Sequence, residues 1–484
     1  MKRTLAVLFS LALFLHGGAS LASKIDALAR LQSAIDQVLA TPDLKAGFQG
    51  VSILSLKDHT TLYERNADKV FIPASNTKLL TSAFALHQLG SEFSFETSVQ
   101  YTGSLQAEGV LQGDLVLVGS GDPTLSLDNL RTLAHQVAVQ GVKRIQGVLR
   151  LDTKRFDTEP YAEGWAIDDE AYSYQTPILG INLNHNTFDL YVRPGKAPGD
   201  PVEIETRPAI DARWFHITAK TTKKEALTIT RDHDTKTITI AGERSVDTKP
   251  ERTLVDSLAI PNVSEFVLQQ FEALLKAEGV SLESTSAFSP HAPLQKLAST
   301  RSESLLKLLE KMNKPSDNLI ADCLFLASAK EAPSLSWSQS QALYPSAFKQ
   351  MGLDTNHIRI KDGSGLSRQN LVSPRNLVRL LSFCATMPAS SSFYDSLPIA
   401  GVDGTLKNRM KQTRAENNCR AKTGSLGGVS SLSGYVKTMD GELLAFSLLM
   451  NNHTCPSSKA RTAQDRIVVL LAGFRRKSLS KSEE

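Results

Sequence analysis

A serine and a lysine three residues apart, Ser75 and Lys78, are the first residues whose types and spacing suggest chemistry. They stand at the start of an apolar helical pattern that runs to Leu89 and stops at Gly90. Residues three apart share a helix face, so both side chains are expected on one face at the N-terminal end of this helix. The exposed amides there favour a developing negative charge, and a lysine packed against the serine can lose its proton and act as a base. The pair therefore fits nucleophilic catalysis by a serine.

The Ser-x-x-Lys spacing alone is not specific, because it recurs elsewhere in the chain, where it indicates an ordinary helix face. Two further motifs make it specific. Ser316-Asp317-Asn318 is the only Ser-x-Asn sequence in the chain, and Lys422-Thr423-Gly424 is the only Lys-Thr-Gly sequence. They follow Ser75 in the order that penicillin-recognising serine acyl-transferases use. Three motifs in this order indicate acyl transfer.

The first 22 residues have the pattern of a secretory signal peptide. Lys2 and Arg3 precede an apolar block from Leu5 to Leu15, and Ser20-Leu21-Ala22 fits a cleavage site. The apolar block is too short for an ordinary transmembrane helix, although a single-span anchor is the alternative. The pattern predicts export, most simply to the periplasm.

Composition excludes several functional classes. The formal net charge of the 484 residues is only +4, which argues against a nucleic-acid partner. The cysteines and histidines lack zinc-like spacing, so no metal site is expected, and no cofactor is implied. With 41% hydrophobic residues the chain can bury a large core, divided over two or three domains. Nothing in the sequence specifies an oligomeric state.

Periodicity divides the chain into three stretches. Near the N-terminus it predicts an amphipathic helix from Ile25 to Val38 and a hairpin from Gly50 to Leu62. The stretch from Ser91 to Pro290 reads mostly as strand and turn, with a helix at its end from Val263 to Glu278 that Gly279 closes.

Helical patterns return after Pro290. A helix from Ser302 to Met312 is stopped by Pro315, which leaves Ser316 and Asn318 on a connecting turn. A glycine-rich loop, Asp362 to Arg368, precedes an antiparallel meander that begins with the Lys422 strand and continues over Val429–Val436 and Leu443–Met450. The last helix, Lys459 to Phe474, ends in Arg475-Arg476-Lys477. This basic end fits either contact with an anionic membrane surface or a helix that closes the domain.

These residues resemble those of the class C low-molecular-mass penicillin-binding proteins, which act as D-alanyl-D-alanine carboxypeptidases and endopeptidases. Besides the three motifs, the resemblance includes Gly119 to Leu125 and Asp362 to Arg368, and it extends over essentially the whole mature chain. The most diagnostic feature is the long interval from Lys78 to Ser316, where class C proteins carry two extra domains.

The resemblance implies an α/β fold of the penicillin-binding-protein and β-lactamase type, in which helices flank an antiparallel sheet. Residues 23–90 and 291–484 would form the peptidase domain, interrupted by two nested strand-rich domains within residues 91–290.

The resemblance also implies a mechanism. Ser75 would attack the carbonyl between the last two D-alanines of a peptidoglycan stem peptide, with neutral Lys78 as base, and water would hydrolyse the acyl-enzyme. Ser316 would relay the proton to the leaving amine, while Asn318 would orient Lys78 or hold the substrate amide. Lys422 would supply positive charge. The same site would bind β-lactam antibiotics covalently.

Substrate-binding residues also follow from the resemblance. Thr423 and Ser425 would bind the terminal carboxylate, and Gly424 belongs to the same strand motif. Asp152 resembles a position that contacts the amino end of a diaminopimelate-type side chain, and Arg368 would reach a neighbouring carboxylate. A surface or structural role fits Asp152 and Arg368 equally well. Gly427 departs from relatives that carry a polar side chain at its position, which leaves the preferred stem peptide open.

Two other functions compete with this interpretation. A β-lactamase needs a dedicated general base for the deacylating water, and the sequence identifies none. A catalytically silent cell-wall binding module on the same fold is the non-enzymatic alternative, against which the intact motif residues argue. A Gly-x-Ser-x-Gly hydrolase is disfavoured because that pattern is absent.

Overall fold

The computed structural model describes residues 27–249, 253–283, 293–331 and 334–476. The predicted signal peptide, residues 1–22, and Ile25 lie outside these ranges. The helix expected near the N-terminus is present over described residues 27–39.

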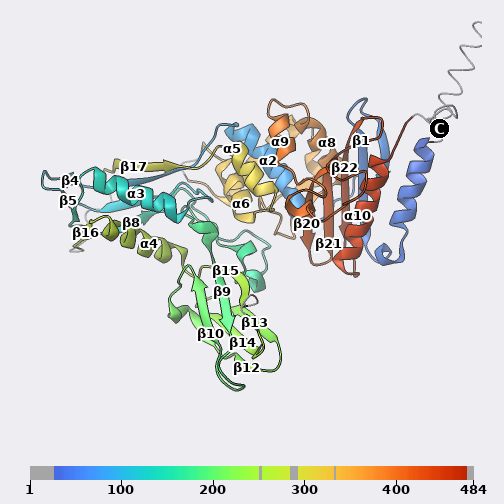
Figure 1. The fold of residues 1–484 in the computed structure, drawn as a ribbon. Coiled ribbons are helices and arrows are strands. Elements are labelled where there is room, and N and C mark those ends of the chain that lie inside the picture. Colours follow the sequence, from blue (N-terminus) through green and yellow to red (C-terminus); the bar gives the residue numbers. More distant parts are fainter. Residues whose placement is uncertain (1–26, 250–252, 284–292, 332–333, 477–484) are drawn as a thin grey trace, which may run out of the picture.

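A five-stranded antiparallel sheet organises the part of the chain that holds the first and third motifs (Figure 1). Its strand order is β2-β1-β22-β21-β20, so β1, from the first part of the chain, pairs with β22, from the last part. The predicted N-terminal hairpin and C-terminal meander are both confirmed. The strands are β1 (Phe48–Ser55), β2 (Thr61–Arg65), β20 (Arg420–Leu426), β21 (Val429–Lys437) and β22 (Leu443–Asn451).

Both faces of this sheet are buried, because successive side chains along a strand point to opposite faces. In β22, Leu444 and Phe446 face a core formed with the helix over residues 27–39 and with α10 (Ser457–Ala472). Ala445 and Leu449 face a second core on the other side. The sheet is thus the middle layer of three.

The third layer is a group of helices around α2 (Thr77–Leu89). Residues 77–85 of α2 are all buried, because the helix packs against α5, α6, α7 and α8. A helix enclosed in this way holds Lys78 in a fixed place. The surrounding helices are α5 (Leu305–Asn313), α6 (Asn318–Ala327), α7 (Trp337–Gln350), α8 (Pro374–Cys384) and α9 (Ser390–Ser396), with β18 (Ile358–Arg359) and β19 (Leu371–Val372) beside them. The α/β fold class is confirmed.

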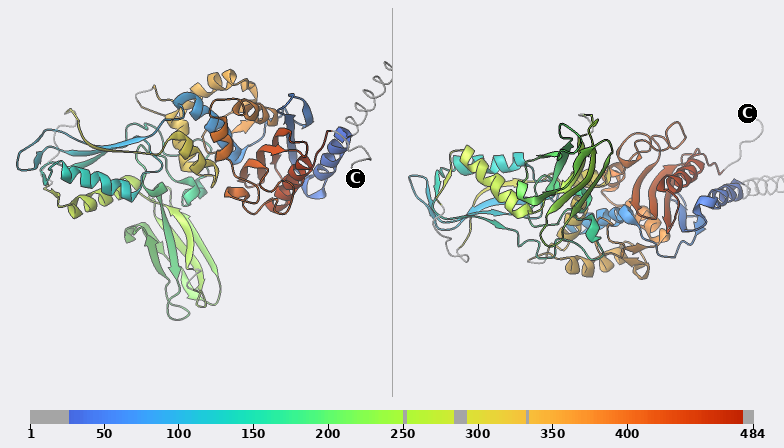
Figure 2. Two further views of the ribbon diagram at one scale, coloured as in Figure 1. Left: turned by 45° about the horizontal axis from the view of Figure 1, so that its top comes forward. Right: turned by 90° about the horizontal axis from the view of Figure 1, so that it is seen from below.

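The stretch between the first two motifs forms two lobes that project from this domain (Figures 1 and 2). The first lobe contains two four-stranded sheets, β17-β3-β6-β8 and β16-β7-β5-β4, together with α3 (Leu127–Val139) and α4 (Val263–Ala277). Its strands are β3 (Glu96–Tyr101), β4 (Ser104–Leu105), β5 (Val110–Gln112), β6 (Leu115–Val118), β7 (Arg144–Ile145), β8 (Leu149–Asp152), β16 (Ser281–Leu282) and β17 (Gln295–Arg301).

The second lobe is almost entirely strand. It contains a three-stranded sheet, β10-β9-β15, and a four-stranded sheet in which β14 pairs with β11, β12 and β13. β13 and β14 form an antiparallel hairpin around Asp232. The strands are β9 (Thr187–Arg193), β10 (Glu203–Arg207), β11 (Phe215–Ile217), β12 (Lys220–Thr222), β13 (Ala226–Arg231), β14 (Ile238–Ser245) and β15 (Leu254–Ala259).

We propose a return point of the inserted region that lies later in the chain than the predicted boundary at Pro290. β17 pairs with β3 along its whole length, although it follows Pro290 in the chain. Phe95 and Ser302 then exchange hydrogen bonds: the Phe95 amide donates to Ser302 Oγ and the Ser302 amide to the Phe95 carbonyl, each over 2.9 Å. The helix expected from Ser302 therefore begins later, because Ser304 is the N-cap residue of α5. We propose that the insertion comprises residues 96–301.

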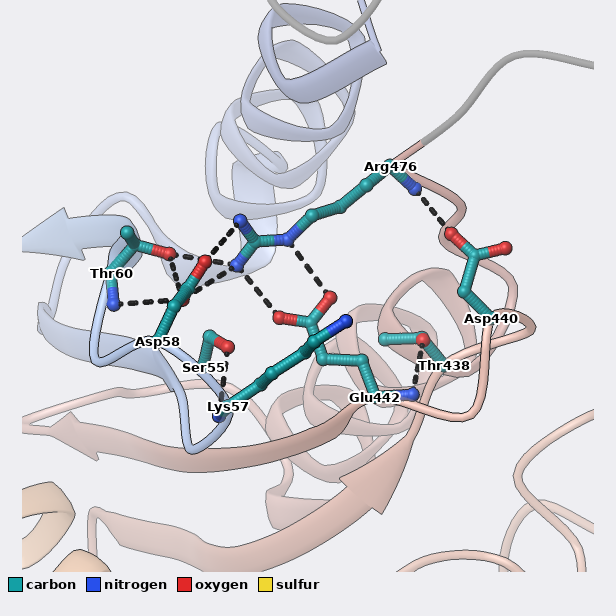
Figure 3. Close-up of polar contacts among 8 residues, drawn as sticks. All are labelled: Ser55, Lys57, Asp58, Thr60, Thr438, Asp440, Glu442 and Arg476. Carbon is teal, nitrogen blue, oxygen red and sulfur yellow. Dashed lines mark hydrogen bonds and ion pairs between the residues drawn. The ribbon is translucent and has the colours of Figure 1, made fainter.

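Arg476, the last residue that the structure describes, links two hairpins of the central sheet (Figure 3). Arg476 follows α10, and its guanidinium donates to Asp58 in the β1–β2 turn, to the Thr60 hydroxyl and to Glu442 at the start of β22. The side chain of Glu442 is only 4% exposed, so the arginine neutralises a buried charge. These contacts fit the domain-closing alternative for the last helix. Lys477 lies outside the described residues.

Within the described ranges, no helix has the length and apolar character needed to cross a membrane.

Candidate active site

Ser75 lies in a tight turn that leads into α2. The turn is the 3-10 helix η2 (Ala74–Asn76), and α2 itself begins at Thr77, two residues later than expected. Ala74, at the start of this turn, has a φ of 48°, in the left-handed region that an α-helix does not contain, so no helix can extend back past Ser75. Lys78 still lies one turn beyond Ser75, and its Nζ is 3.1 Å from Ser75 Oγ. The predicted pair is therefore in direct contact.

Lys78 is completely buried and makes two further hydrogen bonds. Its Nζ donates to Asn318 Oδ1 over 2.6 Å and to the Ser364 carbonyl over 2.7 Å. Burial lowers the pKa of Lys78 to about 8, against the opposing charge of Asp322 and of more distant acids. A lysine with this pKa is partly neutral near pH 7, as a general base must be.

The glycine-rich loop that begins at Asp362 supplies the Ser364 carbonyl. Asp322, from α6, accepts hydrogen bonds from the amides of Gly363 and Ser364 over 2.7 and 2.9 Å. Burial raises the pKa of Asp322, and the charge of Asp362 raises it further. Asp322 thus holds the loop whose carbonyl orients the Lys78 amine.

The second motif stands at the N-terminal end of α6. Asn318 is the first residue of the helix rather than part of the expected turn, because Asp317 is its N-cap: Asp317 Oδ1 accepts from the Ile320 amide over 2.8 Å. Ser316 precedes the cap with a φ of 71°. Its hydroxyl accepts a hydrogen bond of 2.8 Å from Lys422 Nζ. Lys422 is fully buried, and burial together with the charge of Lys78 holds its pKa well below the usual value.

The third motif lies on β20, the strand at the edge of the sheet. Gly424 passes so close to the nucleophile that an added Cβ would lie 2.9 Å from the Ser75 amide nitrogen and 2.7 Å from the Pro73 carbonyl. Only glycine allows this approach. It places the β20 backbone beside Ser75.

The three motifs meet in a cleft of about 790 Å³. Besides the motif residues, its walls come from the inserted region, the glycine-rich loop, the segment that holds Thr405 and Arg409, and the first half of α10. The lining residues are Ser75, Gly164, Ala166, Asp169, Tyr174, Gln175, Ser316, Asn318, Gly365, Leu366, Arg368, Thr405, Arg409, Thr423, Gly424, Ser425, Leu426, Gly427, Ser431, Arg461 and Gln464.

Comparison with known proteins agrees with this geometry. The model of the D-Ala-D-Ala carboxypeptidase 3 (S13) family matches residues 31–474. The chain belongs to the S13 family.

Relatives of known identity extend over most of this S13 chain. It is 34% identical to the D-alanyl-D-alanine carboxypeptidase of Actinomadura sp. (strain R39), over 92% of this chain and 85% of that protein. Its structure is similar to the crystal structure of penicillin-binding protein 4 (dacB) from Haemophilus influenzae, with a TM-score of 0.80 at 27% identity over 91% and 99% of the two chains. The complex of that H. influenzae protein with a β-lactam matches with a TM-score of 0.75 at 28% identity, over 91% and 97% of the two chains.

The residues predicted from sequence divide into two groups in this S13 protein. Hydrogen bonds join Ser75, Lys78 and Asn318, and a separate one joins Ser316 to Lys422. The predicted binding residues Thr423, Gly424, Ser425 and Arg368 line the cleft.

Asp152 is not among the described residues that line the cleft. It ends β8 in the first lobe, where its Oδ1 accepts from the Lys154 amide over 3.0 Å and its carbonyl accepts from the Gly119 amide. A local structural role, the alternative that the sequence left open, accounts for these contacts.

The sequence did not identify the five cleft residues that come from the inserted region, among them Asp169 and Tyr174. Asp169 is the only carboxylate among the lining residues, and its Oδ1 accepts from the Tyr174 hydroxyl over 2.8 Å. The Tyr174 carbonyl in turn accepts from Asn318 Nδ2 over 2.7 Å. The two residues lie in short 3-10 helices, η3 (Ile167–Asp169) and η4 (Ser173–Gln175), which are too short to give a periodic pattern, so only the acidic and aromatic residue types offered a signal.

Proposed function

We propose that this cleft hydrolyses the peptide bond between two terminal D-alanines of peptidoglycan stem peptides, with Ser75 as the nucleophile. The S13 family carries the reaction class, that of a serine-type D-alanyl-D-alanine carboxypeptidase. The observation that carries the mechanism is the 3.1 Å contact between Ser75 Oγ and the buried Lys78 amine.

In the acylation step, neutral Lys78 takes the proton of Ser75 while Oγ attacks the carbonyl of the penultimate D-alanine. Asn318 Oδ1 and the Ser364 carbonyl accept from Nζ, so they aim its lone pair at the serine. The backbone amides of Ser75 and Ser425 stabilise the oxyanion. One such donor is typically worth about 3 kcal/mol.

Expulsion of the leaving D-alanine requires a proton on its amine. Ser316 delivers it, and Lys422, in contact with its hydroxyl, resupplies it. Lys422 also faces the terminal carboxylate bound by Thr423 and Ser425. That negative charge offsets the effect of burial and favours the protonated form of Lys422. Water then attacks the acyl-enzyme: its proton passes through Ser316 to Lys422, and protonated Lys78 returns its proton to Ser75 Oγ as the acyl group leaves.

Recognition of the stem peptide is assigned to the wall from the inserted region. Asp169 is better placed than Asp152 to contact the amino group of a diaminopimelate-type side chain, because it lines the cleft. Arg368 lies beside the turn between β20 and β21, where its guanidinium donates to the Gly427 carbonyl over 3.2 Å. We propose that the same cleft also cleaves peptide cross-links as an endopeptidase.

The cellular location follows from the N-terminal pattern together with the substrate. We propose secretion through a cleaved signal peptide and action in the periplasm. Peripheral contact with the membrane remains a prediction, and Arg476 does not contribute to it freely because its charge is engaged with Asp58 and Glu442.

Intact-mass spectrometry with penicillin tests the function. A single adduct of the full mass of the drug is expected on the wild type, since ring opening loses no atoms, and none on Ser75→Ala. Ser346→Ala, at another Ser-x-x-Lys sequence, is the matched control and should label normally. Release of D-alanine from a pentapeptide should follow the same pattern. Labelling that survives in Ser75→Ala would overturn the assignment, a short-lived adduct with rapid penicillin turnover would favour a β-lactamase, and no adduct at all would favour a silent module.

A further inference from the structure

The Ser316-Asp317-Asn318 motif belongs to the peptidase domain, yet two of its hydrogen-bonding partners come from the inserted region. The Tyr174 carbonyl accepts from Asn318 Nδ2 over 2.7 Å. On the other side of the motif, His185 Nδ1 lies 3.1 Å from Asp317 Oδ2. Neither partner belongs to the three motifs, and both are far from the second motif in sequence.

The contact with Tyr174 fixes which way the Asn318 amide points. Because the carbonyl of Tyr174 can only accept, it takes the NH2 group, and the amide oxygen is left facing Lys78 Nζ at 2.6 Å. A reversed amide would place a donor against the lysine. Tyr174 therefore sets the polarity of the contact that orients the base.

The contact with His185 acts on the backbone between the two motif side chains. Asp317 caps α6 with one carboxylate oxygen and pairs with His185 through the other. Ser316, immediately before it, has a φ of 71°, which a residue with a Cβ adopts only when its surroundings hold it there. A bond that fixes Asp317 therefore fixes both the Ser316 hydroxyl and the Asn318 amide.

The inserted region presents His185 on a rigid turn. Asn184, His185 and Asn186 all have positive φ, between 49° and 57°. The Asn186 side chain holds this turn, since it accepts from the Leu183 amide over 2.9 Å and donates to the Pro177 carbonyl over 3.0 Å. The His185 side chain is 48% exposed and that of Asp317 20% exposed, so water and protons reach the pair.

We propose that His185 is a positioning residue for the second motif, and that its protonated form, paired with Asp317, holds Ser316 and Asn318 in the geometry that acylation requires. The inference rests on the proposed function, because it assigns a role in that same reaction. It makes the inserted region part of the catalytic apparatus.

The charges around the pair favour this state. The hydrogen bond that His185 donates to the Asp317 carboxylate raises the pKa of His185. Burial and the charge of Lys311 oppose this rise, and the charge of Asp122 adds to it. Because Asp317 stabilises the protonated form of His185, the ion pair is complete below the usual pKa of histidine and is lost as the pH rises through the raised pKa. His185, Asp317 and Lys311 line one surface pocket. The other charged residues that line this pocket each have an ionic partner other than His185; they are Glu303, Lys307, Glu310 and Lys314.

The test measures the second-order rate constant of acylation by penicillin from about pH 5.5 to 8.5 in the wild type, His185→Gln and His185→Ala. Glutamine keeps a hydrogen-bond donor but no charge, so the titration of Lys78 cancels in the ratio of wild type to His185→Gln. That ratio is expected to be about three to ten at the acidic end, the effect of one half-exposed charge-assisted hydrogen bond, and to fall towards one at the alkaline end.

His135→Ala is the matched control, since His135 also pairs with a carboxylate of the inserted region, Glu278, but does not touch the motif. It should acylate like the wild type. A ratio that is one at every pH, or a loss that does not change with pH, would overturn the proposal, as would a His185→Ala variant that only melts earlier. Adduct formation by the wild type reports separately on the proposed function.

Discussion

At the scale of single residues, the chemistry depends on Lys78 being neutral when Ser75 needs a base. An exposed lysine has a pKa near 10.4 and is almost wholly protonated at pH 7. Burial of Lys78 lowers this pKa to about 8, so about a tenth of the molecules carry the neutral amine at pH 7. The nearby acids Asp322 and Asp362 limit the effect, because their charge would favour the protonated amine.

The acylation rate should therefore rise with pH and level off above about pH 8, because the reactive neutral form accumulates up to its pKa. Stopped-flow or quenched mass measurements with penicillin between pH 6 and 9 would give the profile. Lys78→Arg retains the cation but does not lose its proton in this range, so a loss of at least about 100-fold is expected at every pH. A flat wild-type profile would rule out Lys78 as the titrating base.

At the scale of elements, β20 and η2 approach each other as closely as backbones allow. Asn76 Nδ2 donates to the Lys422 carbonyl over 2.9 Å, and Ser431 Oγ donates to the Pro73 carbonyl over 2.6 Å. These bonds tie the turn of the nucleophile to the sheet. This close approach explains why the residue of β20 that passes Ser75 is a glycine, Gly424.

Gly424→Ala should lower the acylation rate about 100-fold or more. The added Cβ would push β20 away from the Ser75 amide and disrupt the oxyanion site. Gly427→Ala is the matched control. It adds the same methyl group nearby, where the nearest heavy atom is Arg368 Nη2 at 3.2 Å, the mobile end of a long side chain. Equal penicillin acylation rates for the two variants would contradict the role of the close approach.

The sequence predicted those elements whose signal is local. The meander from Arg420 to Asn451 has strong apolar runs and a clear Asp440-Gly441 turn, and it was found. α3 was missed within a stretch that reads mostly as strands, although Leu130, Leu133, Ala134 and Val137 have helical spacing and Ser126 with Asn129 forms a capping box. The contact of Tyr174 with Asn318 joins residues far apart in the chain, so no local pattern encodes it.

Arg476, which follows the last helix, should contribute to the free energy of unfolding. Arg476→Ala leaves Glu442 buried without its partner and unties the β1–β2 turn, at an expected cost of about 1–3 kcal/mol. Urea unfolding would measure it. Arg475→Ala removes a neighbouring charge for which the described structure records no ionic contact, and it should change stability by less than about 0.5 kcal/mol. Similar midpoints for the two variants would count against the tie.

At the scale of the whole molecule, the inserted region is joined to the peptidase domain at one place but contacts the active site at several. Its chain leaves and re-enters the peptidase domain at one place, since Phe95 and Ser302 are hydrogen-bonded to each other. Its contacts with the active site are distributed: Trp165 Nε1 donates to Asp362 over 2.7 Å, and Tyr174 and His185 contact the second motif. α2, in contrast, packs against helices of the peptidase domain.

Two deletions of nearly equal size should therefore behave differently. Replacing residues 96–301 by a short glycine-serine linker removes β3 together with its partner β17, and it should leave a monomeric, cooperatively folding domain. Replacing residues 91–290 instead leaves β17 without β3, so an unpaired strand edge is exposed and self-association is expected. Size-exclusion chromatography and thermal melts distinguish the two. Identical behaviour would mean that β17 does not belong to the insertion. The monomeric variant should also acylate more slowly than the full chain at equal stability, because Asn318 has lost the Tyr174 carbonyl and Asp317 has lost His185.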